Sequence, residues 1–421
     1  MTLRPGALVR LDVERPVVGG RMIAREGGRV VLVRGAIPGE RVEARIERVQ
    51  RQVAWADTVR VLTASPDRVE VPAGLTCGGQ LLAHVSAARQ RTLKGEILAD
   101  ALRRIGKIAV DGPIEVLSGP ADGYRTRARL HLRGGAAGFF DEGTHRLCDI
   151  APARQLSAAS ADVVQRLVEA VAAAVPGLDA EIEWAEDAAG TVRVAHLIVS
   201  RGRDAAALAG LAPIGGLDGC SAVAADDPKA PRQRLWGDLR VVDRVRVGAA
   251  EVSIAHDARA FFQGNRYLLQ PLVDEVLIGI AGPVLDLYAG AGMFALSAAT
   301  AGHAVTAVEG DPVAAADLAD NAARVPGVTA VHAAVEAHLA GPRHDVGTVV
   351  VDPPRTGLSP AALAGVLDWR PQRLVYVSCD PATLARDLHG CLAVGYRLDG
   401  VRGVDLFPRT GHVEAVVRLA R

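Results

Sequence analysis

The carboxyl-terminal part of the chain, from about residue 259 onward, alternates short apolar runs with segments of helical spacing. Apolar runs that predict buried strands lie at 284–287, 304–308, 346–351, 374–377, 401–406 and 413–419. The segment 312–324 predicts a helix with a proline near its first turn. Because strands that alternate with helices form parallel sheets, we predict an α/β domain over residues 259–421.

The first 62 residues show a different pattern. Short β-rich runs at 30–33, 42–46 and 59–62 are interrupted by the pairs Gly27-Gly28 and Pro38-Gly39. Short strands separated by glycine and proline are typical of small all-β folds. We therefore predict a small β-barrel over residues 1–62.

The region between these two, residues 67–258, has a weaker pattern. Helical spacing at 86–105 places Arg and Lys on a polar face, 163–175 has the pattern of an amphipathic helix, and 192–199 that of a strand. This mixture predicts an α+β central domain. The helix at 86–105 is the part of it that we expect to pack on the carboxyl-terminal domain.

The charges of the chain balance in total but not along its length. Its 421 residues carry 48 basic and 48 acidic side chains, and a net charge of zero argues at first against a nucleic-acid partner. Residues 1–133, however, carry a net charge of +9 and the remainder −9, and only three of the basic residues are lysines. Arginine offers a planar donor fork suited to phosphate. The front of the chain therefore suits RNA, and the alternative is a structural barrel with solvated charges.

Other features indicate a soluble, cytoplasmic protein without membrane contact. The five cysteines are too few and too scattered for a secreted disulfide framework, and we find no signal peptide. The segment 287–308 is uncharged and long enough to span a bilayer. Its glycines at 290, 292 and 302 fit better with a strand end, a loop, a helix and a second strand.

A glycine loop at the end of a predicted strand marks a candidate cofactor site. Asp286-Leu-Tyr-Ala-Gly-Ala-Gly292 leads into a helix, and Glu309 ends the next strand about twenty residues later, where it can accept hydrogen bonds from ribose. The loop has Gly-x-Gly followed by Met293 rather than the Gly-x-Gly-x-x-Gly of dinucleotide sites. This difference favours S-adenosylmethionine, and the alternative is a loop that only turns the chain.

Two further motifs carry groups suited to a planar ring. Asp352-Pro-Pro-Arg355 follows an apolar strand, and its prolines have no backbone donors, so carbonyls and the Asp side chain face a ligand. Methyltransferases that act on nitrogenous rings use such loops, although a structural turn is the alternative. Phe261-Phe-Gln263-Gly-Asn265 combines amides, which pair with a uracil edge or a carboxylate, with rings that either stack on bases or pack in a core.

A cysteine and a glutamate are candidates for the chemistry itself. Cys379 ends an apolar strand just before a helix that Asp380 caps, and a helix N-terminus lowers a thiol pKa, so a thiolate is predicted. Glu414 begins the last strand, where a raised pKa would suit a general base. The alternatives are a buried structural cysteine and an exposed glutamate. We assign structural roles to Cys220, in a glycine-rich loop, and to Cys391, inside a helix.

Taken together, these motifs resemble the RNA 5-methyluridine (uracil-C5) methyltransferase family over nearly the whole chain. Residues 1–62 resemble its TRAM domain, a small barrel of the OB-like type, through Val-Arg-Gly-Ala-Ile-Pro-Gly-Glu at 33–40. The carboxyl-terminal half is similar at the three motifs above and at two more, Val-Ser-Cys-Asp-Pro-Ala-Thr-Leu-Ala-Arg-Asp (377–387) and Asp-Leu-Phe-Pro-Arg-Thr-Gly-His-Val-Glu (405–414). The resemblance implies a class I S-adenosylmethionine-dependent methyltransferase domain of Rossmann-like fold.

The resemblance also implies a mechanism and a set of site residues. Cys379 would be the nucleophile that adds to C6 of uracil, and Glu414 the general base that removes the C5 proton. Residues that match the family's cofactor site are Gln263, Tyr288, Glu309 and Asp352. The target uridine must leave its stack to reach such a site, in structured rRNA or tRNA. The family implies a monomer.

The sequence departs from the family at an iron–sulfur site. Many members bind a cluster through four cysteines, and the matching positions here are Val71, Cys77, Gln80 and Cys148. Two thiolates cannot supply four ligands, so we predict no cluster and no other metal. Asp380 replaces the family's usual Asn beside the nucleophile, and its charge is expected to raise the thiol pKa.

Two alternative functions are less consistent with the sequence. Methylation of an exocyclic nitrogen or another RNA position would use Asp-Pro-Pro-Arg but would need no cysteine. A non-catalytic RNA-binding protein would need neither Cys379 nor Glu414.

Overall fold

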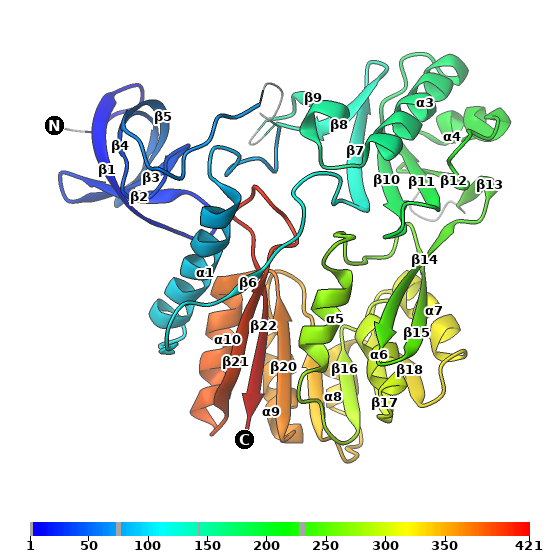
Figure 1. Cartoon of the computed structure of the whole chain (residues 1–421). Helices are drawn as coiled ribbons and strands as arrows, with labels where there is room; N and C mark the ends of the chain where they lie inside the picture. Colours follow the sequence, from blue (N-terminus) through cyan, green and yellow to red (C-terminus); the bar gives the residue numbers. More distant parts are fainter. Residues whose placement is uncertain (1–2, 73–76, 142–143, 227–231) are drawn as a thin grey trace.

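The computed structural model describes residues 3–72, 77–141, 144–226 and 232–421. They form an amino-terminal barrel, a central sheet and a carboxyl-terminal α/β domain (Figure 1). The fold class predicted from the sequence is confirmed.

The amino-terminal barrel is closed and has the strand order β1-β2-β3-β5-β4. Its strands are β1 (Leu8–Pro16), β2 (Met22–Glu26), β3 (Arg29–Arg34), β4 (Arg41–Val49) and β5 (Val53–Thr63). Strict alternation explains its core, because Val9, Leu11 and Val13 of β1 are buried while the charged residues between them are exposed.

The central sheet has seven strands in the order β13-β12-β11-β10-β7-β8-β9. The strands are β7 (Arg127–Arg133), β8 (Ala136–Phe140), β9 (Leu147–Asp149), β10 (Ala180–Glu186), β11 (Arg193–Val199), β12 (Gly219–Ala224) and β13 (Gln233–Gly237). The helix α3 (Ala158–Ala174) buries its apolar face on this sheet, and the short α2 (Ile150–Ala153) and α4 (Gly202–Ala207) flank it. Cys220 is fully buried in β12. The sequence analysis was wrong to place it in a loop, but its burial in the core agrees with the structural role assigned to it.

The α/β domain is built on an eight-stranded sheet with the order β18-β17-β16-β19-β20-β22-β21-β6. The strands are β6 (Val116–Leu117), β16 (Val284–Leu287), β17 (Val305–Glu309), β18 (Val328–His332), β19 (Thr348–Val351), β20 (Arg373–Ser378), β21 (Arg397–Val404) and β22 (Glu414–Ala420). The first five in this order are parallel, whereas β22 is antiparallel to both β20 and β21.

Helices cover both faces of this sheet. Because side chains alternate along a strand, Leu285 and Leu287 of β16 face one core and Val284 faces the other. The helices on the two faces are α5 (Leu269–Leu277), α6 (Met293–Thr300), α7 (Pro312–Ala322), α8 (Val335–Leu339), α9 (Pro360–Trp369) and α10 (Pro381–Ala393). The segment 287–308 forms the end of β16, the helix α6 and the start of β17.

Residues 67–258, predicted as one central domain, are divided in the structure between the central sheet and the α/β domain. The helix α1 (Ala87–Arg104) packs on α10 and buries Leu98 and Leu102 in the core of the α/β domain, and β6 pairs with β21 (Figure 1). The hairpin of β14 (Arg240–Val247) and β15 (Ala250–Asp257) packs on α6 and α7. Within the described ranges, no helix combines the length and the apolar character needed to cross a bilayer.

Candidate active site

The glycine loop lies between β16 and α6 at the carboxyl edge of the parallel strands. Tyr288 has a φ of 61°, in the left-handed region that non-glycine residues seldom adopt, and Gly292 has a φ of 95° at the start of α6. Glu309 holds this loop: one carboxylate oxygen accepts a hydrogen bond from the Gly290 amide (2.7 Å) and the other from the Asp311 amide (2.7 Å). Glu309 thus fixes the loop against the end of β17.

Asp286, the second-last residue of β16, is a buried carboxylate to which the sequence analysis gave no role of its own. Among the described residues neither of its oxygens has a hydrogen-bond partner at ordinary distance. Burial and the nearby Asp352 and Glu309 raise its pKa well above the usual range. An unpaired carboxylate beside an open glycine loop fits a ligand that brings its own donors, as S-adenosylmethionine does with its ammonium and ribose hydroxyls.

Asp352 and Gln263 meet at the end of β19. The Gln263 amide donates to the Asp352 carboxylate at 3.3 Å, and burial raises the pKa of Asp352 to about 7. The sequence left open whether Phe261 and Phe262 stack on bases or pack in a core, and the structure shows that the two rings differ in burial. Phe262 is buried and stacks on the His256 ring with centroids 4.0 Å apart, whereas Phe261 is 74% exposed.

Cys379 and Glu414 lie at the same end of two neighbouring strands. Ser378 pairs with Ala415 across β20 and β22, and Cys379 and Glu414 are the adjacent residues. Burial raises the pKa of Glu414 well above its usual range, and Asp352 adds to this shift.

The thiolate predicted from the helix dipole is not found. Burial is the largest cause that raises the pKa of Cys379 to about 11, followed by Glu414, while Arg355 lowers it. The carboxylate of Asp380 caps α10 by accepting from the Ala382 and Thr383 amides. Burial and the neighbouring carboxylates therefore outweigh the helix N-terminus, and the resting thiol is protonated at neutral pH.

Electrostatic interactions and a hydrogen bond connect several of the predicted site residues. Asp352 influences the pKa of Asp286 on the cofactor side and of Glu414 and Cys379 on the other. Tyr288 is half-buried at the cofactor end, where burial and the carboxylates around it raise its pKa to about 12. Arg355, exposed in the loop that follows Asp352, lowers the pKa of both Cys379 and Glu414. The sequence analysis gave it no role, although its place in Asp-Pro-Pro-Arg was the available signal.

The positions that match the family's iron–sulfur ligands do not form a cluster site. Val71 lies exposed, and the Gln80 amide donates to the Ala153 carbonyl at 2.9 Å. Cys77 and Cys148 are free thiols, and burial raises the pKa of each. Valine supplies no donor, and the two thiols alone are too few for a cluster. No set of three or more metal-binding side chains occurs in the part of the chain that the structure describes.

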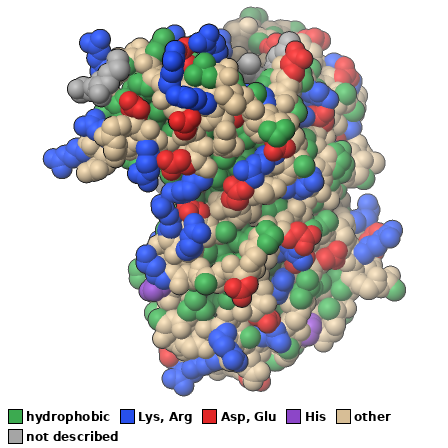
Figure 2. All heavy atoms as spheres, turned by 60° about the vertical axis from the view of Figure 1, so that its left-hand side comes forward, with side chains coloured by type: hydrophobic (Ala, Val, Ile, Leu, Met, Phe, Trp, Pro, Cys, Tyr) green, Lys and Arg blue, Asp and Glu red, His purple; other side chains and the backbone are tan. Residues whose placement is uncertain are grey.

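Basic side chains gather on the barrel. Figure 2 shows Lys and Arg side chains over its surface. Exposed arginines of the barrel are Arg4, Arg10, Arg25, Arg41, Arg45, Arg48, Arg51 and Arg60. Arg48 lies 3.8 Å from the centre of the Trp55 ring, which places a guanidinium and an aromatic ring together on this surface.

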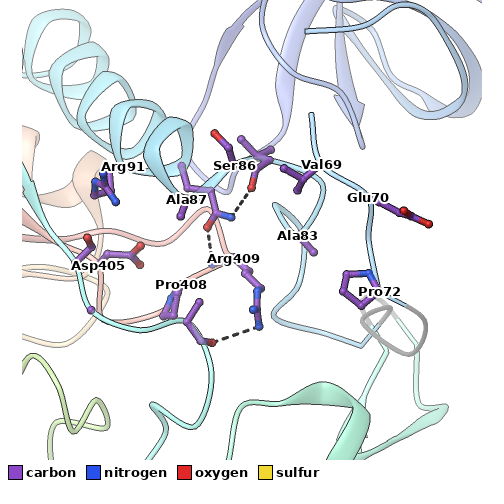
Figure 3. A pocket seen from close by; sticks show the side chains of 15 residues that line it. Val69, Glu70, Pro72, Ala83, Ser86, Ala87, Arg91, Asp405, Pro408 and Arg409 are labelled. Atoms are coloured by element: carbon purple, nitrogen blue, oxygen red, sulfur yellow. Dashed lines mark hydrogen bonds between the residues drawn. The ribbon is translucent and has the colours of Figure 1, made fainter. Parts of the chain in front are cut away.

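A cavity of about 360 Å³ lies apart from these residues, between the segments 69–72, 83–91 and 118–121 and the loop 405–409 (Figure 3). None of the six predicted site residues lines it. It is therefore not the candidate cofactor site. Part of its lining comes instead from the loop that precedes Glu414.

Comparisons with known proteins cover the whole chain. A family model described as tRNA (Uracil-5-)-methyltransferase matches residues 233–421, and a TRAM domain model matches residues 3–59. The 23S rRNA (uracil(1939)-C(5))-methyltransferase of Methylococcus capsulatus is 33% identical over 99% of this chain and 98% of its own length. That of Pseudomonas putida is 32% identical over 98% of this chain and 93% of its own length.

A solved structure has the same fold. The tRNA (uracil-54, C5)-methyltransferase of Pyrococcus abyssi, in complex with S-adenosyl-L-homocysteine, superposes with a TM-score of 0.75. It is 24% identical, and the match covers 97% of this chain and 99% of that one.

Proposed function

Since the chain belongs to the RNA uracil-C5 methyltransferase family with an amino-terminal TRAM domain, we propose that it methylates C5 of a uridine in structured RNA. The observation that carries the proposal is the placement of Cys379 and Glu414 at the same end of β20 and β22. Neither an exocyclic-nitrogen methyltransferase nor a binding protein needs this pair.

The residues on the cofactor side suit S-adenosylmethionine. Asp286, Tyr288, Glu309, Asp352 and Gln263 would hold it along the carboxyl ends of β16, β17 and β19. When bound, it supplies an electrophilic methyl group on a sulfonium sulfur.

Uracil C5 is too weak a nucleophile to take this methyl group unaided. Addition of Cys379 to the ring makes C5 more nucleophilic. After its proton passes to solvent, the Cys379 sulfur forms a bond to C6, and the C5–C6 electrons move toward the C4 carbonyl as an enolate. C5 then attacks the methyl group, whose bond to the sulfonium sulfur breaks. The site must first deprotonate a thiol of pKa about 11.

Glu414 completes the reaction. Its carboxylate takes the proton from C5, the electrons of that C–H bond form the C5–C6 double bond, and the thiolate leaves C6. A carboxylate whose pKa is raised by burial is a stronger base than one in water. Cys379 returns to its starting state, so the cycle balances.

We propose 23S rRNA as the substrate, because the full-length rRNA-modifying relatives are 32–33% identical to the chain. A tRNA is the second candidate, since the tRNA (uracil-54, C5)-methyltransferase of Pyrococcus abyssi superposes over 97% of this chain and 99% of its own. The exposed Phe261 ring offers a surface on which a base can stack, and the barrel arginines offer contacts to phosphates.

The test is incubation with S-adenosylmethionine and 5-fluorouridine-substituted transcripts. One transcript is a 23S rRNA fragment that includes the position equivalent to uracil 1939, and the other is a tRNA that carries uridine 54. Because fluorine cannot leave C5 as a proton does, the adduct is trapped after methyl transfer. We expect a denaturant-stable complex with the rRNA fragment, linked through Cys379.

The matched control is a second cysteine in the same region. Cys379→Ala should abolish the adduct and lower turnover on uridine RNA by about 10⁴-fold or more. Cys391→Ala, in the buried face of α10, should retain both. Methylation without an adduct, or methylation of a nitrogen, would overturn the proposal. An adduct with the tRNA alone would make tRNA, rather than 23S rRNA, the substrate.

A further inference from the structure

The loop 405–413, which joins β21 to Glu414, is held by residues far away in the sequence. The Gln90 side-chain oxygen accepts a hydrogen bond from the Arg409 amide at 2.9 Å, and the Leu82 amide donates to the Arg409 carbonyl at 2.7 Å. Arg409 has a φ of 63°, a left-handed conformation that a non-glycine residue keeps only where its surroundings impose it. The loop is therefore fixed from outside its own hairpin.

The loop borders a cavity on one side. Asp405, Pro408 and Arg409 line the cavity of about 360 Å³, and Figure 3 shows the hydrogen bonds of Arg409 at its edge. On the side of α1, the fully buried Lys94 ammonium pairs with the Asp405 carboxylate and donates to the Phe407 carbonyl at 2.8 Å. Polar contacts to α1 thus act together with the packing of the buried Leu406 and Val413 to place the loop.

The barrel reaches the same loop by direct backbone contact. Gly20, in the turn between β1 and β2, touches Gly411: a Cβ added at Gly20 would lie 2.7 Å from the Gly411 Cα. A Cβ added at Gly411 would lie 2.3 Å from the Gly20 Cα. Neither separation is possible for a real Cβ, so the contact exists only because both residues are glycines.

We propose that the β1–β2 turn of the barrel is a positioning element for Glu414, acting through Gly20, Gly411 and the loop 405–413. The proposal rests on the proposed function, in which Glu414 is the base and the barrel binds the RNA. Glu414 follows the contact residue Gly411 by three positions. Docking of the barrel on this loop would therefore hold the carboxylate of Glu414 at a fixed position relative to RNA bound by the barrel. A displacement of about 1 Å is enough to lower a catalysed rate by about 100-fold.

Gly19 provides a matched control for Gly20. Both have left-handed φ values, 88° for Gly19 and 80° for Gly20, so alanine strains the backbone equally at either position. A Cβ at Gly19 meets no atom within 4 Å, whereas one at Gly20 meets Gly411. Gly411→Ala is a second variant, because Gly411 is outside the left-handed region and its substitution tests the contact alone.

The experiment compares Gly19→Ala, Gly20→Ala and Gly411→Ala in the full chain. The kinetic readout is turnover of the uridine-containing 23S rRNA fragment, and adduct formation with its 5-fluorouridine form separates the nucleophile from the base. We expect Gly20→Ala and Gly411→Ala to lower kcat by about 100-fold while adduct formation and the KM for RNA change by less than about threefold. Gly19→Ala should keep the wild-type kcat.

Hydrogen exchange of the loop amides gives a readout that needs no activity. Exchange of peptides covering 405–413 should be faster in Gly20→Ala and Gly411→Ala than in Gly19→Ala. Equal exchange and equal kcat in Gly19→Ala and Gly20→Ala would overturn the inference, as would parallel losses of adduct and turnover. Failure of the proposed function is distinguishable, because the wild-type chain would then form no adduct while the exchange difference persisted.

Discussion

The two sides of the candidate active site are held in different ways. On the cofactor side, neighbouring motifs hold one another: Glu309 binds the Gly290 amide, and the Asp352 amide donates to the Leu287 carbonyl at 3.3 Å. On the reactive side, the loop before Glu414 is held by Gln90 and Lys94, more than 300 residues earlier. Most contacts on the cofactor side thus join the loops at the ends of the parallel strands, whereas the loop on the reactive side depends on contacts with α1.

This difference predicts which substitutions act on which side. A change in α1 or in the barrel should alter the reactive side and leave the cofactor side intact. The following measurements test that separation, in order of decreasing expected effect.

Lys94→Met should lower the free energy of unfolding by about 3–5 kcal/mol, because it leaves the buried Asp405 carboxylate without its partner. Urea unfolding measures this loss. The double variant Lys94→Met/Asp405→Leu should recover most of it, since an apolar pair leaves no buried charge. Affinity for S-adenosylhomocysteine should remain at the wild-type level in the folded protein. A matching loss of that affinity would show that the two sides of the site are not held independently.

Phe261→Ala should weaken binding of the 23S rRNA fragment by about 5- to 150-fold, the range expected when one aromatic ring no longer stacks on a base. Fluorescence anisotropy with labelled RNA measures the change. Tyr267→Ala removes another exposed aromatic side chain, 41% exposed, and serves as the control with a smaller expected effect. Equal losses in both variants would show that Phe261 has no special contact.

The reactivity of Cys379 should follow the charges around it. Its thiol has a raised pKa of about 11, so its thiolate fraction rises about tenfold per pH unit from pH 7 until the pH approaches that value. Glu414→Gln removes a negative neighbour and should lower this pKa by about one unit, whereas Arg355→Met removes a positive one and should raise it by a similar amount. The rate of iodoacetamide alkylation of the Cys379 peptide against pH measures both, and shifts in the same direction would contradict this account.

Arg45→Gln, on the exposed surface of the barrel, should reduce the slope of log affinity for RNA against log salt by about one. Arg397→Gln is the control, because Arg397 is also exposed but begins β21 at the end remote from Glu414. This is the smallest expected effect, a change of a few-fold in affinity at fixed salt. Equal slopes for Arg45→Gln and the wild-type chain would remove Arg45 from the RNA surface.

Local patterns predicted much of the fold and the location of the site. The run 284–287 coincides with β16, Asp380 caps α10 as expected, and Glu414 begins the last strand. These features depend on residues within one turn or one strand, where side-chain alternation and capping act directly. The predicted thiolate at Cys379 was wrong, because its pKa is set by burial and by Glu414 across the sheet rather than by the helix beside it.

The amino-acid sequence is enough to predict the alternation of strands and helices, the position of the glycine loop and the candidate reactive groups. These properties depend on short segments of the chain, since periodicity and turn residues act over a few positions. Three features become visible only in the folded chain: Arg355 acts on the Cys379 thiol, Phe261 is exposed while Phe262 is buried, and Gly20 touches Gly411. Local patterns could not predict these features, because burial and contacts between distant segments depend on how the whole chain packs.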